Sequence, residues 1–173
     1  MNSGYYVRLA RPGEGPRLNE VEQAAGELFD GLDHLFSNDV DDNFPLDALE
    51  DLIAAGMVWV ACDAHDVPVG FLALIDLDGS PHIEELDVDP EHQRRGLGRA
   101  LIEAARAWVR EHGGEALTLS TFRSVPWNAP YYARAGFEIV PEEQLTVAFR
   151  ELRDAEARRG LPADARVIMR APA

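Results

Sequence analysis

The spacing of apolar residues divides the chain into helical and extended segments. Leu18, Val21 and Ala25 recur at helical intervals after Pro16, a good first-turn residue, whereas Leu117 and Leu119 alternate with polar residues as in a strand. Such spacing predicts helices after Pro16, after Pro45, from Gly98 to His112, near Asn128 to Ala135, and in a segment ending at Gly160. It predicts strands at 5–9, 57–62, 67–75, 83–88, 116–121, just after Gly136-Phe137, and at 166–170.

The order of these elements predicts a mixed α/β (α+β) fold. The strands at 57–62, 67–75 and 83–88 are separated by short polar turns, so we expect them to pair antiparallel. A helix connects 83–88 to 116–121, and the two strands of such a βαβ unit run parallel. We therefore expect a mixed, mostly antiparallel twisted sheet of six to seven strands, flanked by helices, with a central parallel βαβ unit. Without an internal repeat or linker, residues 1–173 are expected to form a single domain.

The charge of the chain disfavours two classes of partner. It carries 31 acidic and 16 basic residues, a formal net charge of −15. This charge repels nucleic acid and anionic membrane surfaces and attracts cations such as amines, although it equally serves solubility. No signal segment or membrane-spanning apolar stretch is evident, so we expect a cytoplasmic protein with neither nucleic acid nor membrane as a partner.

Cysteine and histidine give no metal signature. The single cysteine, Cys62, lies in an apolar run, where a buried hydrophobic side chain is the simplest interpretation. His82 and His92 lack nearby Cys or carboxylate residues at ligand spacing. We therefore expect no metal.

A basic, glycine-containing turn follows the strand at 83–88. Its residues are Gln93, Arg94, Arg95, Gly96, Leu97, Gly98 and Arg99. Between a strand and a helix, such a turn offers unpaired N–H groups and the positive helix end to a diphosphate. A dinucleotide fingerprint would need glycine at Leu101 and an acid near Thr118, and a Walker loop would need lysine, which the chain lacks. A turn with solvated arginines is the alternative interpretation.

Two sequence blocks give this region a family resemblance. Leu86-Asp87-Val88-Asp89-Pro90 followed by Gln93 to Gly98 resembles the strand and Gln/Arg-x-x-Gly-x-Gly/Ala turn of the GNAT superfamily of acyl-CoA N-acyltransferases. Tyr132 to Phe137 resembles the family's Tyr-x-x-x-Gly-Phe block. Together the blocks cover residues 82–139, the core of the expected N-acetyltransferase domain.

The resemblance implies a binding site for acetyl-CoA. In such proteins the strands matching 82–88 and 116–121 splay apart, pantetheine bonds backbone near Leu86, Asp87 and Val88, and diphosphate meets the basic turn. A backbone N–H near Val88 would stabilise the oxyanion. Asn128 is a candidate for bonding pantetheine, although it stands closer to Tyr132 than is common in the family.

The resemblance also suggests catalytic residues. Glu84 and Glu85 are candidates for taking the amine's proton, with Glu84 preferred as base and Glu85 as amine-binding group. Simple alternation puts Glu84 with Leu86 and Val88, and Glu85 with Ile83 and Asp87, but a family bulge makes this parity unreliable. Two solvated carboxylates are the alternative.

Tyr132 matches the family tyrosine that protonates the departing thiolate, and it alone, rather than Tyr131, stands four positions before Gly136. Helix packing is the alternative role for Tyr132.

These inferences predict transfer of the acetyl group of acetyl-CoA to a primary amine, small or peptide-borne, by direct attack in a ternary complex. Trp127 is a candidate wall of the acceptor pocket, and Asp39, Asp41, Asp42 and Phe44 lie where the fold shapes that pocket, although a solvated acidic loop is the simpler interpretation. The alternative function is a noncatalytic acyl-CoA-binding regulatory module, which would need neither Glu84 nor Tyr132. The possibility of a homodimer rests on the family resemblance alone.

Overall fold

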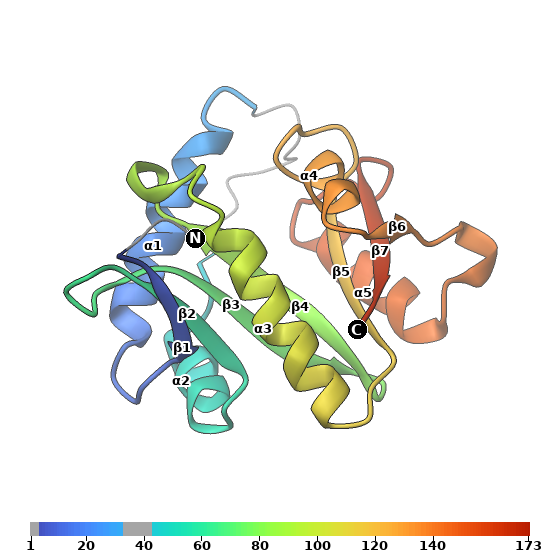
Figure 1. Ribbon diagram of the computed structural model, residues 1–173. Helices are drawn as coiled ribbons and strands as arrows, with labels where there is room; N and C mark the ends of the chain where they lie inside the picture. Colours follow the sequence, from blue (N-terminus) through green and yellow to red (C-terminus); the bar gives the residue numbers. More distant parts are fainter. Residues whose placement is uncertain (1–3, 33–42) are drawn as a thin grey trace.

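One mixed sheet runs through the molecule (Figure 1). The structure is a computed structural model that describes residues 4–32 and 43–173. In this part of the chain the strands are β1 (Tyr6–Leu9), β2 (Val58–Cys62), β3 (Pro68–Leu77), β4 (Ser80–Val88), β5 (Ala116–Phe122), β6 (Glu138–Ile139) and β7 (Arg166–Pro172). The helices are α1 (Gly15–Gly26), α2 (Leu46–Ala54), α3 (Leu97–Glu111), α4 (Ala129–Arg134) and α5 (Val147–Arg158), with 3-10 turns η1 (Glu27–Phe29), η3 (Pro90–His92) and η4 (Glu142–Gln144).

The strand order is β1-β2-β3-β4-β5-β7-β6, and every neighbouring pair is antiparallel except β4 and β5. Both the mixed sheet and the central parallel βαβ unit, formed by β4, α3 and β5, are thus confirmed. β4 and β5 pair only where His82 and Ile83 oppose Thr118 and Leu119. Beyond that point the two strands diverge toward the top of Figure 1. The divergence opens the sheet at its centre.

Helices cover both faces of the sheet. Leu101, Ile102 and Ala105 of α3 are fully buried against the strands, and residues of α4 join the same cluster. On the opposite face, α1 and α2 pack on β2 and β3, and α5 packs on β7. No helix of the described part combines the length and apolar composition needed to cross a bilayer.

Trp108 of α3 packs against the core beside Val109, as predicted, with its ring centroid 6.1 Å from that of Trp59, and it also stacks on His112 with ring centroids 4.0 Å apart. The last helix differs from its predicted form. Leu145, predicted as part of the last helix, precedes α5, because the Thr146 side chain accepts from Phe149 N and starts the helix there. The cap formed by Thr146 therefore sets the start of α5, although the apolar spacing includes Leu145.

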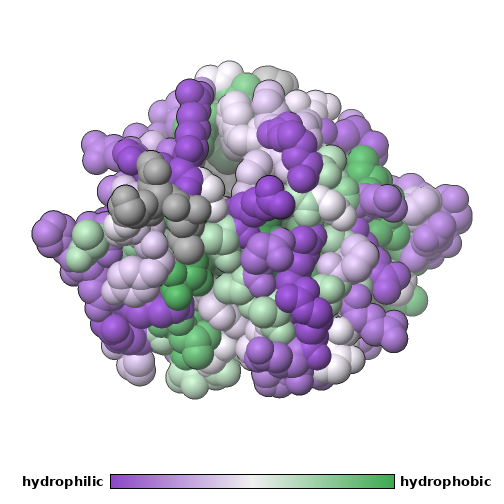
Figure 2. Space-filling view, viewed as in Figure 1, coloured by the Kyte–Doolittle hydropathy of each residue, from purple (hydrophilic) through white to green (hydrophobic). Residues whose placement is uncertain are grey.

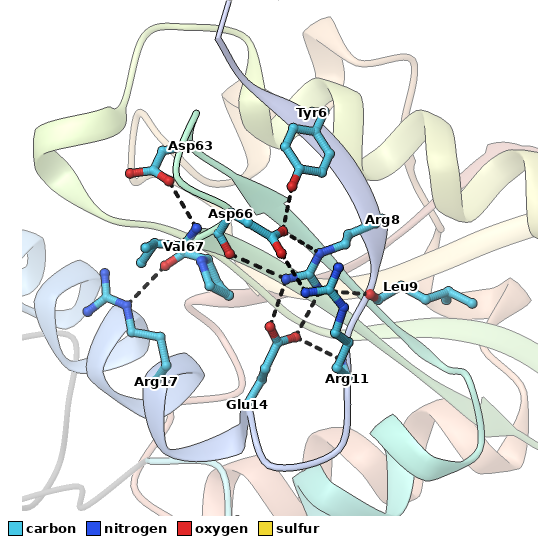
Figure 3. Close-up of polar contacts among 10 residues, drawn as sticks. Tyr6, Arg8, Leu9, Arg11, Glu14, Arg17, Asp63, Asp66 and Val67 are labelled. Carbon is cyan, nitrogen blue, oxygen red and sulfur yellow. Dashed lines mark hydrogen bonds and ion pairs between the residues drawn. The ribbon is translucent and has the colours of Figure 1, made fainter.

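An ion-pair network secures the segment before α1 (Figure 3). Arg8 of β1 contacts Glu14 at 2.7 Å and Asp66 of the β2–β3 turn at 2.9 Å, and Tyr6 and Arg11 also bond Asp66. These ion pairs hold the start of α1 against the β2–β3 hairpin. The helix α1 also contacts β4.

A second, more buried ion pair joins α5 to β7. Arg166 contacts Glu156 at 2.7 Å, with side chains only 13% and 7% exposed, and Ser120 of β5 donates to the same carboxylate at 3.0 Å. Because removing Glu156 leaves a buried guanidinium without its counter-charge, we expect Glu156→Ala to lower the free energy of unfolding by about 3 kcal/mol. Urea denaturation measures this change.

Glu103→Ala is the matched control. Glu103 pairs with Arg106 at 2.9 Å but is 51% exposed, so its loss should cost less than about 1 kcal/mol. Equal losses for the two variants would contradict a structural role for the buried pair.

Candidate active site

The divergence of β4 and β5 opens into a cleft of about 1960 Å³. Figure 2 shows the surface hollowed between the start of α3 and α4. The cleft is lined by residues of α1, β4, β5 and α4 and by the turn before α3. Of the predicted site residues, it brings together Glu84, Glu85, Leu86, Asp87, Val88, Gln93, Arg94, Gly96, Leu97, Gly98, Asn128 and Tyr132.

A β-bulge in β4 decides which carboxylates face which side of the sheet. Ala73 opposes Glu85 but Leu74 opposes Ile83, so Glu84 is the extra residue of the bulge. Simple alternation is therefore wrong here: Glu85 does not share a face with Ile83. It shares one with Asp87, on the side of the sheet that α1 covers.

The same ladder directs backbone groups into the gap. Asp89 N donates to Val69 O at 2.9 Å, which marks a hydrogen-bonded position of the β3–β4 pair. These positions alternate, so the N–H and C=O groups of Leu86 and Val88 are directed away from β3, toward the diverging β5. Gln93 Nε2 donates to Val88 O at 3.1 Å and so braces the end of β4. An extended ligand with amide groups fits this edge.

The basic turn contains two residues with a left-handed backbone. Arg94 and Gly96 have φ values of 59° and 82°, and α3 begins at Leu97, one residue earlier than predicted. The first-turn N–H groups of α3 therefore point out of the helix toward the cleft end. Arg95 and Arg99 are exposed but do not line the cleft, and Arg95 lies 5.6 Å from the Tyr5 ring centroid. Of the three arginines, Arg94 is the one at the cleft.

Two tyrosines of α4 reach the cleft. The Tyr131 hydroxyl lies where a side chain on Gly98 would begin, 2.7 Å from the ideal Cβ position, so glycine permits the close contact of α4 with α3. Burial raises the pKa of Tyr132 well above its usual range, and the charges of Glu85 and Asp87 raise it further. Tyr132 therefore keeps its proton at neutral pH.

Two carboxyl groups of β4, those of Glu85 and Asp87, interact with each other. Burial raises the pKa of Asp87 to about 7, the Glu85 side chain hydrogen-bonds to it and lowers that value, and the charge of Glu22 on α1 raises it. Glu22 itself accepts from Phe44 N at 2.8 Å. A carboxylate that titrates near neutral pH is suited to take a proton from an amine.

Asn128 orients its amide between strand and cleft. Its Oδ1 accepts from Thr121 Oγ1 at 2.6 Å and from Phe122 N at 3.4 Å. With the oxygen engaged by β5, the Nδ2 group is the part of the amide left for a ligand. The family role predicted for Asn128 stays a prediction.

Two features of the site had no clear signal in the sequence. Glu22 lies among the apolar positions of α1, and the sequence does not distinguish it from any other helical carboxylate. Tyr131 belongs to no family motif. Asp39, Asp41 and Asp42 lie outside the described residues. Within 4–32 and 43–173, no group of three or more His, Cys, Asp or Glu side chains is arranged to hold a metal ion.

A mixed sheet that opens at its one parallel pair, beside a basic turn, defines the class of protein. The chain belongs to the acetyltransferase (GNAT) family, whose model matches residues 21–137. The PaiA N-acetyltransferase of Thermoplasma acidophilum, solved with coenzyme A, has the same fold: its TM-score is 0.72 at 15% identity, covering 98% of this chain and 99% of that one.

Two curated relatives are similar in sequence. Over 101 residues the chain is 29% identical to the peptidyl-lysine N-acetyltransferase YjaB of Escherichia coli (strain K12), covering 56% of this chain and 63% of that protein. Over 124 residues it is 35% identical to the aminoglycoside N(6')-acetyltransferase type 1 of Stenotrophomonas maltophilia, covering 65% of this chain and 77% of that protein. The match thus spans less than two thirds of the first relative.

The basic turn yields a binding prediction. Gly96→Glu would put a carboxylate where diphosphate is expected, and should raise the Kd for acetyl-CoA at least about tenfold by charge repulsion at the helix start. Calorimetric titration measures the Kd.

Gly113→Glu is the matched control, because Gly113 has a similar φ of 76°, has open space around its Cβ position like Gly96, and lies just beyond the opposite end of α3. Both variants carry the same backbone strain, but only Gly96→Glu should weaken binding. Equal Kd values for the two would remove the turn from the cofactor site.

Proposed function

We propose that the chain transfers the acetyl group of acetyl-CoA to a primary amine by direct attack within a ternary complex. The observation that carries the proposal is the grouping of Glu85, Asp87 and Tyr132, which interact electrostatically in the cleft between β4 and β5. This grouping supplies a proton acceptor and a proton donor. Membership of the GNAT family supports the same reaction, as do the amine-acetylating activities named for the relatives above.

Each group has one role in the proposed reaction. When bound, acetyl-CoA supplies an activated acetyl thioester. The Glu85–Asp87 pair takes a proton from the incoming ammonium, which frees the nitrogen lone pair for attack on the carbonyl carbon. The Val88 N–H donates to the oxygen that gains negative charge. Tyr132 would give its proton to the departing thiolate and regain one from the attacking nitrogen, while the Glu85–Asp87 pair would release its proton to solvent, so the protons balance.

The base is assigned to the Glu85–Asp87 pair rather than to Glu84 alone. Glu85 shares a face with Asp87 and raises the pKa of Tyr132, whereas Glu84 is the extra residue of the bulge. The resemblance favours Glu84 because of its position in the strand. Mutation separates these two assignments.

Tyr132→Phe tests the proton donor. The change should lower kcat at least about tenfold by removing the general acid, while leaving the Kd for acetyl-CoA within about twofold. Release of the CoA thiol measures turnover, and calorimetry measures binding. Tyr131→Phe serves as the control for loss of a neighbouring hydroxyl and should retain kcat. An unchanged kcat in Tyr132→Phe would exclude Tyr132 from the reaction.

The pKa of Asp87 gives a pH prediction. Because the pair must be ionised to accept a proton, kcat/KM should rise with pH up to about 7 and then level off until other groups titrate. Asp87→Asn should abolish the rise near pH 7 and reduce kcat/KM.

Glu84→Gln separates the two candidate bases. If the pair is the base, this variant keeps the rise in kcat/KM near pH 7. If Glu84 is the base, Glu84→Gln strongly lowers kcat/KM across the pH range, whereas Asp87→Asn changes it little. A protein that binds acetyl-CoA but releases no thiol with any amine would instead be the noncatalytic binding module.

Asp87 also affects stability. Its carboxyl has a folded-state pKa raised above the ordinary value of 3.8, so the folded state holds the proton more tightly than the unfolded state does. The free energy of unfolding should therefore fall as pH rises from about 4 through about 7. Urea denaturation at a series of pH values should show this fall in the wild type and a smaller one in Asp87→Asn.

A further inference from the structure

Three aromatic side chains from distant parts of the chain meet at the cleft. Phe29 of η1 lies with its ring centroid 5.8 Å from that of Phe122, at the end of β5, and 5.8 Å from that of Trp127, before α4. All three line the cleft, and we name them the aromatic wall. Because η1 directly follows α1, the wall joins the N-terminal half of the molecule to the strands beyond the divergence.

Trp127 exposes much of its ring in this wall. It is 41% exposed, whereas Phe122 is 4% exposed. The Phe29–Trp127 contact is edge-to-face, with planes 70° apart, so part of the indole surface is open rather than stacked. A large aromatic side chain left open inside a cleft is typical of a ligand-binding surface.

The other side of the same cleft is acidic. Glu85 and Asp87 lie on the face of the sheet covered by α1, and Glu22 of α1 is close enough for its charge to act on Asp87. An ammonium group is drawn to these carboxylates and can also interact favourably with an aromatic face. The cleft thus offers a cation site and an apolar surface together.

A basic residue beneath the wall is already neutralised. The guanidinium carbon of Arg166 lies 4.8 Å from the ring centroid of Phe122. The guanidinium donates to the Glu156 carboxylate at 2.7 Å and to the Ser120 hydroxyl at 3.2 Å. Its charge is therefore engaged by Glu156 rather than offered to a ligand. The other basic residues that line the cleft are Arg94, Arg134 and Arg159. A carboxylate next to the reacting amine, as in an amino acid, would be repelled by Glu85 and Asp87.

We propose that the acceptor is a primary amine that carries an aromatic ring and no carboxylate. The amine meets the Glu85–Asp87 pair while the ring lies against Trp127 in the aromatic wall. The proposal rests on the proposed acetyltransferase function and narrows its acceptor. The proposed class of acceptor excludes polyamines, aminoglycosides and amino acids.

A substrate series tests the acceptor class. CoA thiol release is measured with 2-phenylethylamine and tryptamine, and with spermidine, kanamycin, ethanolamine and phenylalanine. The two arylalkylamines should exceed each of the others at least about tenfold in kcat/KM, a typical gain from apolar contact in a pocket. Phenylalanine is the sharpest comparison, because it adds only a carboxylate to 2-phenylethylamine.

Variants of Trp127 test the wall itself. Trp127→Ala should raise KM for 2-phenylethylamine at least about tenfold with kcat changed less than about threefold, and leave KM for ethanolamine within about twofold. Trp127→Phe, which keeps a flat ring, should restore most of the affinity. Val147→Ala removes an apolar side chain that is 70% exposed and outside the cleft, so it should change nothing.

The outcomes separate the two proposals. If spermidine, kanamycin, ethanolamine or phenylalanine is acetylated as well as the arylalkylamines, or if Trp127→Ala affects all amines alike, the aromatic acceptor is wrong while the acetyltransferase function stands. If no amine releases thiol from a protein that binds acetyl-CoA, the acetyltransferase function is wrong, and the aromatic acceptor is wrong with it.

Discussion

The early end of the β4–β5 ladder is the constraint on which the rest of the site depends. Buried backbone N–H and C=O groups need partners, and the two strands supply them to each other only around His82 and Ile83. Past that point the sheet has an internal edge, where Gln93 bonds Val88 O and Asn128 bonds Phe122 N in place of strand partners. His82 helps to secure the paired position that precedes Ile83: its Nδ1 lies 2.8 Å from Thr118 Oγ1, and burial lowers its pKa to about 4. The imidazole is therefore uncharged at neutral pH.

The opening lets two halves of the chain contribute different chemistry to one cleft. The N-terminal half brings carboxylates from α1 and β4, and the C-terminal half brings Tyr132 and much of the aromatic wall. A separate ion pair stabilises each half: Arg8 with Asp66 in the N-terminal half, and Arg166 with Glu156 in the C-terminal half. In a chain with a net charge of −15, the basic turn before α3 is a local exception. The proposed cofactor and amine would thus be attracted to different parts of the same cleft.

Much of the fold could be predicted because its signals are local. Residues that are adjacent in sequence determine the turns, the apolar spacing and the helix between β4 and β5. The element order and the parallel pair were therefore predicted correctly. The errors arose where a single residue changed the local geometry. Thr146 caps α5 and leaves Leu145 outside it, and the bulge at Glu84 overturns the alternation along β4. Periodicity alone does not show an inserted residue, because the bulge is defined by pairing with β3.

The sequence by itself determined the family, the basic turn at 93–99 and the position of Tyr132, because motifs with fixed spacing carry these features. Only the tertiary structure decided that Asp87 rather than Ile83 accompanies Glu85, that Glu22 lies near enough to raise the pKa of Asp87, and that Phe29 meets Trp127. The reason is physical. Burial, charge coupling and ring contacts depend on distances between segments far apart in the chain, and strand register and packing set those distances.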